Sequence, residues 1–375
     1  MDLNRQDCLK KTFAEDLRIK RQSELDGVIV GYWSYYENQC LNNQRFLRSD
    51  FGTNENCLKK YNELYARGRE EKIHFLSLDL IDDFSKVDLF VFSDVPKKNS
   101  LLAKKAYAQN KPMFLILEES AVVYPRNWDL KNHEPFEKIL TWDDRFVDNK
   151  KYFKFNHYFI ATRTVPRNID EKKKLCVTIA ANKKSAHPLE LYSERERAIR
   201  WFEKYHPEDF DLYGFGWDER AFPMDIPLIR LLNGRKMKFL RKYLAPKYPS
   251  WRGTVKKKSD ILGRYWFSIC YENARDITGY ILEKIFDCFF CGTVPVYRGA
   301  DNIGDYIPKE CYLDQRDFKN YDELYDVMKR MSREEYLSYL DNIEAFLNSE
   351  AAGIFSSEYF VGLVLTEIRK SLNKG

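Results

Sequence analysis

Long hydrophobic runs are missing from this sequence. No stretch of its 375 residues approaches the ~18 consecutive apolar residues that mark a membrane-spanning helix. The first residues, MDLNRQDCLKK, also lack the apolar segment of a secretory signal. We therefore expect a cytoplasmic protein, peripheral at the inner face of a membrane at most, whose eight cysteines are reduced thiols.

Several signatures of enzyme chemistry are absent as well. There is no Walker loop, no G-x-S-x-G and no G-x-G-x-x-G, which disfavours P-loop, α/β-hydrolase and dinucleotide-binding interpretations. The five histidines are scattered without metal-ligand spacing. Cys288 and Cys291 form a single CxxC at the end of a helical pattern, so packing is favoured over redox or metal chemistry.

Positive charge exceeds negative charge only slightly in this sequence. The net charge of +5 is mild for this length and does not indicate a nucleic-acid partner. We interpret the lysine runs 172–174 and 256–258 as solvated faces, with attraction to an anionic lipid or to a nucleotide diphosphate as the alternative.

What the chain does contain is an alternation of apolar strands with helical segments. In the first half, strands are expected at 27–33, 72–80, 88–94 and 112–119, with a short strand or turn at 139–142. The alternation restarts at 174–182, after a polar stretch that we take as the hinge. This pattern predicts two doubly wound parallel-sheet domains. We divide the chain into residues 1–163, residues 164–350 and a C-terminal helix within 351–375.

The stretch from Tyr265 to Phe318 carries the most specific signal. A strand ends at Glu272 and Asn273, a helix with Glu283 and Lys284 follows, and a second strand runs from 294 to 297. Such βαβ units bind ligands at the carboxyl ends of their strands. A lysine in the first turns of a helix suits a diphosphate. The sequence therefore predicts a nucleotide-type donor site in the second domain.

This stretch resembles the donor-binding signature of the family 10 glycosyltransferases, the α1,3/α1,4-fucosyltransferases. The matching positions are Tyr265, Phe267, Glu272, Asn273, Gly279, Tyr280, Glu283, Lys284, Pro295, Tyr297 and Gly299. The resemblance implies a GT-B arrangement, in which two Rossmann-like domains face a cleft. It also implies inverting transfer of fucose from GDP-fucose to a hydroxyl of a glycan or a surface-polysaccharide precursor.

Donor-binding residues follow from the same resemblance. We expect Lys284 and Arg195 to bind the diphosphate, with Arg197 and Arg200 as rivals of Arg195 on neighbouring helix faces. The resemblance assigns Glu283 to ribose and sugar hydroxyls. Asn273 is expected to bind sugar hydroxyls, and Tyr280 to stack on or bond the nucleoside. Each of them also has an ordinary interpretation as a cap, a turn residue or a core residue.

The catalytic base is expected in the other domain, at the carboxyl end of the strand 112–119. That strand ends in Glu118 and Glu119, and alternation places the two side chains on opposite faces. The resemblance favours Glu119 over Glu118. A glutamate base works best with a raised pKa, which closure of a cleft could provide.

Acidic pairs at 81–83 and 142–144 could hold a divalent ion on a diphosphate, but neither lies beside the donor signature. With Lys284 and Arg195 to neutralise the leaving group, we predict no metal site and no required cofactor. The basic stretch 236–247 and the C-terminal helix motivate a hypothesis of peripheral membrane contact. The oligomeric state is left open.

Two alternatives remain from the sequence. Leu282 replaces the threonine of the family pattern, so a transferase of the same fold that uses another nucleotide sugar stays open. A non-catalytic glycan- or nucleotide-binding module is the alternative from a different class of protein.

Overall fold

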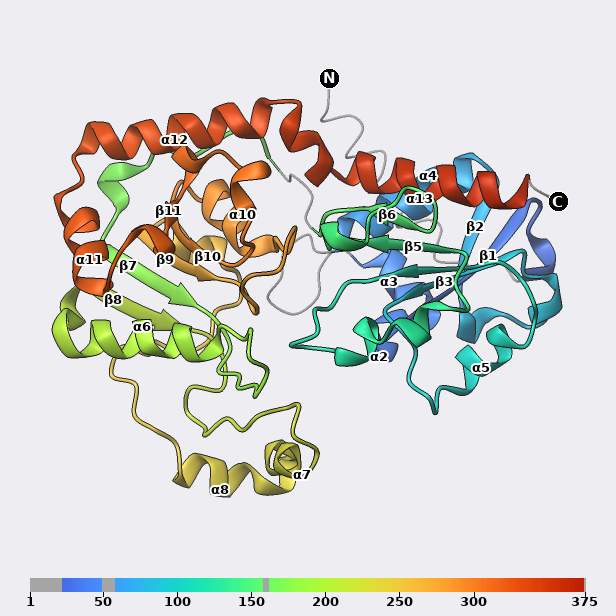
Figure 1. Cartoon of the computed structure of the whole chain (residues 1–375), viewed down its shortest axis with the longest axis horizontal. Coiled ribbons are helices and arrows are strands. Elements are labelled where there is room, and N and C mark those ends of the chain that lie inside the picture. The colour runs from blue at the N-terminus through green and yellow to red at the C-terminus, as the bar shows by residue number, and fades with distance from the viewer. Residues whose placement is uncertain (1–21, 49–57, 158–161, 374–375) are drawn as a thin grey trace.

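The computed structural model describes residues 22–48, 58–157 and 162–373. Two sheets, each built only of parallel strand pairs, lie side by side with helices around them (Figure 1). The predicted class of two doubly wound α/β domains is confirmed.

The first sheet has the strand order β2-β1-β3-β4-β5-β6. All the strands expected from the sequence are present, and the short segment near 139 is a strand. A further edge strand, β6, was not expected, because it has only three residues and lies among polar residues. The bounds are β1 Val28–Ser34, β2 Ile73–Ser77, β3 Leu89–Ser93, β4 Met113–Ile116, β5 Lys138–Thr141 and β6 Tyr152–Lys154. The helices here are α2 Glu37–Cys40, α3 Gln44–Leu47, α4 Lys59–Glu70 and α5 Leu101–Tyr107.

The second sheet has the order β11-β10-β9-β7-β8. Its strands are β7 Lys174–Ile179, β8 Phe210–Tyr213, β9 Tyr265–Tyr271, β10 Val294–Arg298 and β11 Leu313–Asp314. Strand β9, which carries the signature, pairs with β7 and β10 and is buried along most of its length. Its helices are α6 Tyr192–Tyr205, α7 Pro227–Arg230, α8 Lys238–Tyr243, α9 Ser259–Leu262, α10 Glu283–Phe290, α11 Tyr321–Arg330 and α12 Arg333–Asn348.

The last helix, α13 (Ser357–Leu372), returns to the first sheet. Figure 1 shows it running along α4 over the first domain, on the same edge of the molecule as α12, which lies over the second. Its apolar residues join the core of the first domain, and the Phe360 ring lies 5.6 Å from that of Tyr61. Lys138 and Glu367 add an ion pair of 3.5 Å. Because the apolar face of α13 is covered by protein, the structure does not support membrane docking through this helix.

The domains contact each other through the loop that precedes α10. A Cβ atom at Gly279 would lie 2.3 Å from the carbonyl oxygen of Trp142, so only glycine allows this approach. On the other side of the contact, Asp144 accepts hydrogen bonds from Asn302 (2.9 Å) and Tyr306 (2.5 Å). Because Trp142 and Asp144 follow β5, the carboxyl end of the first sheet faces the second domain.

Candidate functional site

The end of β4 is shaped by an aspartate from the neighbouring strand. Asp94 follows β3 with a positive φ of 62° and is buried. Its Oδ1 atom accepts hydrogen bonds from the backbone N–H groups of Glu118 (2.7 Å) and Glu119 (3.1 Å). Burial raises the pKa of Asp94, and the two neighbouring glutamates raise it further. Asp94 therefore fixes the backbone that carries both candidate bases.

Glu118 points into the first domain, toward positive charge. Its carboxylate lies 2.6 Å from Arg45 and 3.3 Å from Lys60, and it accepts a hydrogen bond of 2.7 Å from Tyr61. Burial by itself would raise the pKa of Glu118, but the two cations outweigh burial and lower it. Glu118 is thus a fixed anion inside the domain.

Glu119 points the other way, toward the second domain. Tyr36 donates a hydrogen bond of 2.5 Å to its Oε1 atom. Burial raises the pKa of Glu119, while Tyr36 and Lys183 oppose the rise. Lys183 and Glu283, which also act on this carboxyl, both belong to the second domain. Of the two glutamates, Glu119 is therefore the one that faces the cleft with a raised pKa.

A buried carboxylate at the end of β9 orients Lys284. Glu272 is fully buried, and its Oε1 atom accepts a 2.8 Å hydrogen bond from the N–H of Leu282, at the start of α10. Its Oε2 atom pairs with Lys284 Nζ at 2.8 Å, and Asn273 Oδ1 lies 3.4 Å from the same nitrogen. The structure therefore brings Asn273 and Lys284 together, with Glu272 as the group that holds them.

Glu283 is paired on the neighbouring side of α10. Lys258 Nζ lies 3.5 Å from Glu283 and 2.7 Å from Asp287. Burial opposes ionisation of Glu283, but Lys258 and Lys284 outweigh burial and hold its pKa at about 2. The interpretation of the run 256–258 as a solvated face is wrong for Lys258, whose side chain is only 15% exposed. It is also wrong for Lys172, whose ammonium donates to the carbonyls of Gly263, Tyr265 and Gly292.

Arg195 is the arginine of α6 that reaches the end of β9. Its Nη2 atom donates to the carbonyls of Tyr271 (2.9 Å) and Glu272 (3.2 Å), and burial lowers its pKa. The rivals point elsewhere. Arg197 pairs with Glu194, and Arg200 pairs with Glu203 while lying over a tyrosine ring. Arg195 is thus the only one of the three that lies beside Glu272.

Lys183 is a site residue that the sequence analysis missed. It follows β7 and keeps an exposed side chain, yet the protein atoms around its ammonium lower its pKa by desolvation, although Glu119 favours its charged form. The same pKa also responds to Lys284, Arg195 and Glu283. Among the residues that the structure describes, no carboxylate forms an ion pair with Lys183. Its position at the carboxyl end of a central strand was the one available signal, and a strand end alone does not distinguish it from any loop lysine.

Tyr280 lies in the core rather than in open space. Its ring is 1% exposed and lies 4.6 Å from the ring of Trp142, between the two domains. The expectation that Tyr280 contacts a nucleoside stays a prediction, since the structure gives this ring a protein partner. Cys288 of the CxxC is buried in the core of the second domain, as expected for packing.

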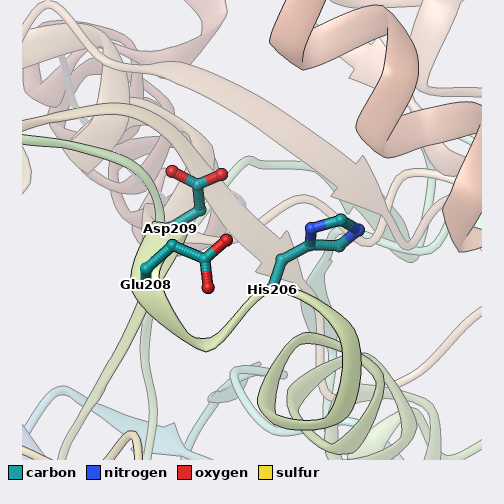
Figure 2. A group of neighbouring side chains, drawn as sticks. All are labelled: His206, Glu208 and Asp209. Carbon is teal, nitrogen blue, oxygen red and sulfur yellow. The ribbon is translucent and has the colours of Figure 1, made fainter.

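One turn gathers three side chains of the types that ligate metals. Figure 2 shows His206, Glu208 and Asp209, all from the turn between α6 and β8. Asp209 already accepts 2.7 Å hydrogen bonds from Tyr325 and Lys329, and the His206 ring stacks on Tyr325 at 3.6 Å. The turn precedes β8, so it lies at the amino end of the sheet, away from the strand ends that carry Glu272 and Lys183. The contacts of His206 and Asp209 with neighbouring side chains explain this arrangement by packing within the protein.

The two acidic pairs noted in the sequence also have protein partners. Asp83 accepts from Ser85, Asp143 pairs with Arg145 at 2.6 Å, and Asp144 pairs with Lys154 at 2.6 Å. These carboxylates cap turns and join the domains.

A cavity of about 580 Å³ opens at the carboxyl ends of β7 and β8. Asn182, next to Lys183, contributes to its wall, as do the rings of Phe215 and Trp251. This volume lies in the usual range for small-molecule sites. The carboxyl ends of β7 and β8 therefore open into a cavity whose wall also includes Arg220, Lys238 and Arg241.

Two parallel-sheet domains with a site between their strand ends define the GT-B glycosyltransferase fold. The whole chain is similar to a crystal structure of an α1,3-fucosyltransferase, with a TM-score of 0.53 and 14% identity over 96% of this chain and 94% of that one. It is also similar to an α-glucosyltransferase solved with UDP-glucose and DNA, with a TM-score of 0.51 and 12% identity over 91% of this chain and 98% of that one. At these identities the likeness shows the fold alone.

The sequence comparisons find similarity in the C-terminal half of the chain. Residues 234–352 match the family model described as glycosyltransferase family 10 (fucosyltransferase) C-term. An 88-residue stretch is 39% identical to the α-(1,3)-fucosyltransferase FucT of Helicobacter pylori, covering 23% of this chain and 18% of that protein. A 70-residue stretch is 33% identical to the α-(1,4)-fucosyltransferase of Arabidopsis thaliana, covering 19% of this chain and 17% of that protein. Over residues 234–352, the chain is thus similar to glycosyltransferase family 10. Each of these two matches spans less than a fifth of the relative's own length.

Proposed function

We propose that this protein transfers fucose from GDP-fucose to a hydroxyl of a glycan or a surface-polysaccharide precursor, with inversion at the anomeric carbon. One observation carries the proposal. Glu119 of the first domain interacts with Lys183 of the second, and Lys183 in turn interacts with Lys284 and Arg195, so a base of raised pKa lies across from cations of the other domain. The match to the family model and the names of the relatives support fucose as the sugar.

In this mechanism Glu119 removes the proton of the acceptor hydroxyl as that oxygen attacks the anomeric carbon. The bond between the anomeric carbon and the diphosphate oxygen breaks, and its electron pair leaves with GDP. Lys183, Lys284 and Arg195 stabilise the charge that develops on the diphosphate. A single displacement from the opposite face inverts the anomeric centre.

The donor diphosphate would add hydrogen bonds to cations that the protein already orients. Lys284 is held by Glu272, and Arg195 is held by two carbonyls of the same strand end. Oriented donors of this kind lose little freedom on binding, which favours affinity. We further propose that Glu283, ionised throughout the physiological pH range, accepts hydrogen bonds from ribose hydroxyls, and that Asn273 binds a sugar hydroxyl.

Three cations can balance the charge of the departing nucleotide, so we propose turnover without a metal ion. The test is to measure fucosyl transfer before and after treatment with EDTA. Equal rates support the proposal, and a loss of activity that Mg²⁺ or Mn²⁺ restores would contradict it.

Nucleotide binding tests the donor site directly. In calorimetry we expect GDP to bind and UDP to bind much more weakly. Lys284→Ala removes a charged hydrogen-bond donor and should weaken GDP binding by about 1.5–3 kcal/mol. Lys309→Ala is a matched control, because Lys309 is exposed and makes only a long ion pair with Asp317. Equal GDP affinity of the wild type and Lys284→Ala would contradict the assignment.

One observation favours an alternative function, the transfer of a sugar other than fucose. Leu282, half-buried at the start of α10, stands where the family pattern has a hydroxyl-bearing threonine. A donor screen that monitors nucleotide release distinguishes the alternatives. Release from GDP-fucose supports fucosyl transfer, and release from another nucleotide sugar alone supports the alternative.

A further inference from the structure

The segment between β8 and β9 has a one-sided charge. From Ile226 to Ser259 the chain contains eleven lysines and arginines and no aspartate or glutamate. This segment includes α7, α8 and the turns between them. Figure 1 shows α7 and α8 projecting from the second sheet, below it in this view. A protein with a net charge of only +5 thus concentrates positive charge on one projection.

Large apolar side chains are exposed on the same projection. Leu228 is 81% exposed, Leu231 65%, Phe239 85% and Tyr243 80%. Leu228 and Leu231 are three residues apart, and Phe239 and Tyr243 are four apart, so each pair lies on one helical face. We call these four side chains, together with the exposed cations Arg230, Arg235, Lys236 and Lys247, the α7–α8 surface. Clustered apolar exposure of this kind marks a contact site.

The projection is held in place by contacts with the segment that precedes it in the sequence. Arg241 pairs with Glu219 at 2.6 Å and donates to the carbonyls of Leu232 and Gly234. Asn233 donates to the carbonyl of Phe222. The buried polar groups therefore point toward the protein, while the apolar side chains point outward.

We propose that the α7–α8 surface docks the protein on an anionic lipid bilayer. Anionic headgroups complement a segment that has cations and no acidic residue, and the acyl boundary accepts the aromatic and aliphatic tips. A nucleic acid would satisfy the charge but not the apolar side chains. A bilayer with anionic lipids satisfies both. This inference does not depend on which sugar the enzyme transfers.

The proposal replaces the contact expected of the C-terminal helix. The apolar face of α13 is buried against the first domain, whereas the α7–α8 surface belongs to the donor-binding domain. Docking would therefore hold the second domain at the membrane. Among the described residues no helix is long and apolar enough to cross a bilayer, so the contact would be peripheral.

Vesicle flotation of the full chain tests the proposal. Wild-type protein should float with phosphatidylglycerol-containing vesicles, float much less with pure phosphatidylcholine vesicles, and lose binding as salt is raised. Phe239→Ser/Tyr243→Ser and Arg235→Glu/Lys236→Glu should each reduce the vesicle-bound fraction at least tenfold.

Matched controls lie on α5 of the first domain. Leu101, 74% exposed, gives Leu101→Ser, and exposed Lys104 and Lys105 give Lys104→Glu/Lys105→Glu with the same change of charge. Both controls should float like the wild type. The thermal unfolding midpoint of every variant is measured to exclude loss of fold.

A second measurement does not require removal of any charge. Phe239→Trp adds a tryptophan at the proposed contact to the seven of the wild type, and the emission of the variant minus that of the wild type should shift to the blue with anionic vesicles. The proposal is overturned if the wild type fails to bind anionic vesicles, if the α7–α8 variants float like the controls, or if the emission of Phe239→Trp does not move. Binding to duplex DNA without binding to vesicles would equally overturn it.

Discussion

Two adjacent glutamates at the end of β4 have opposite environments. Glu118 lies among Arg45, Lys60 and Tyr61, whereas Glu119 has a tyrosine hydroxyl and a facing lysine. The first arrangement stabilises a permanent anion, and the second keeps a carboxyl that can gain and lose a proton. Substitutions of the two residues should therefore have different effects, one on activity and the other on stability.

Glu119→Gln should abolish fucosyl transfer while leaving GDP affinity and the unfolding midpoint close to those of the wild type. Glu118→Gln should instead destabilise the fold by about 3 kcal/mol, because it leaves buried cations uncompensated. Transfer kinetics, calorimetry and chemical denaturation of both variants check these outcomes. Full transfer activity in Glu119→Gln would remove Glu119 as the base.

The raised pKa of Glu119 predicts the acid limb of the pH profile. Only the ionised carboxylate accepts a proton, so kcat/KM should fall as pH drops through a pKa above the usual glutamate value of 4.5. Tyr36→Phe removes the hydrogen bond that opposes the rise, so it should move this limb to higher pH. An acid limb that stays in place in Tyr36→Phe would contradict the assignment.

At the scale of the element, the loop before α10 joins the domains through a glycine. Gly279 has a φ of +73° and no room for a Cβ atom beside the Trp142 carbonyl. The requirement comes from the contact between domains. Gly279 therefore belongs to the signature for a packing reason.

Gly279→Ala should destabilise the protein by about 1–3 kcal/mol, through backbone strain and the clash with Trp142. Gly362→Ala is the matched control, because Gly362 lies in α13 with open space around its Cα. That control should be neutral or stabilising by about 0.4–1 kcal/mol. Denaturant unfolding compares them, and equal stability of Gly279→Ala and the wild type would show that the loop adapts.

At the scale of the molecule, Asp144 links the two domains. It receives hydrogen bonds from Asn302 and Tyr306 of the second domain and pairs with Lys154 of the first. Lys154, Asn302 and Tyr306 together hold the pKa of Asp144 below its usual value, against the effect of burial. The carboxylate is therefore charged at neutral pH and keeps its three partners.

Asp144→Ala should loosen the arrangement of the domains and increase the radius of gyration of the nucleotide-free protein. Asp129→Ala serves as the control, because Asp129 only caps a short turn within the first domain. Small-angle X-ray scattering of both variants checks the expectation. A radius of gyration unchanged from the wild type in Asp144→Ala would show that other contacts suffice.

The fold and half of the site could be predicted from the sequence, because both depend on patterns among neighbouring residues. Apolar strands alternate with helices, and the spacing of Glu272, Asn273, Glu283 and Lys284 along one βαβ unit fixes their neighbourhood. The sequence did not predict strand β6, which is short and lies among polar residues. It also did not predict that protein covers the apolar face of α13. Neither feature depends on a local sequence pattern. Lys172 and Lys258 were misread for the same reason, since the carbonyls and carboxylates that receive them come from distant segments.

The sequence by itself determined the two α/β domains and the family signature, because strand periodicity and residue spacing are properties of neighbouring residues. Only the tertiary structure decided which glutamate faces the cleft, which arginine of α6 reaches β9, and that Lys183 joins Lys284. The first of these facts depends on how the two sheets meet, and the other two depend on how distant segments of the chain fold onto the second sheet. Charged side chains that are far apart in the sequence interact electrostatically only when the fold brings them close in space.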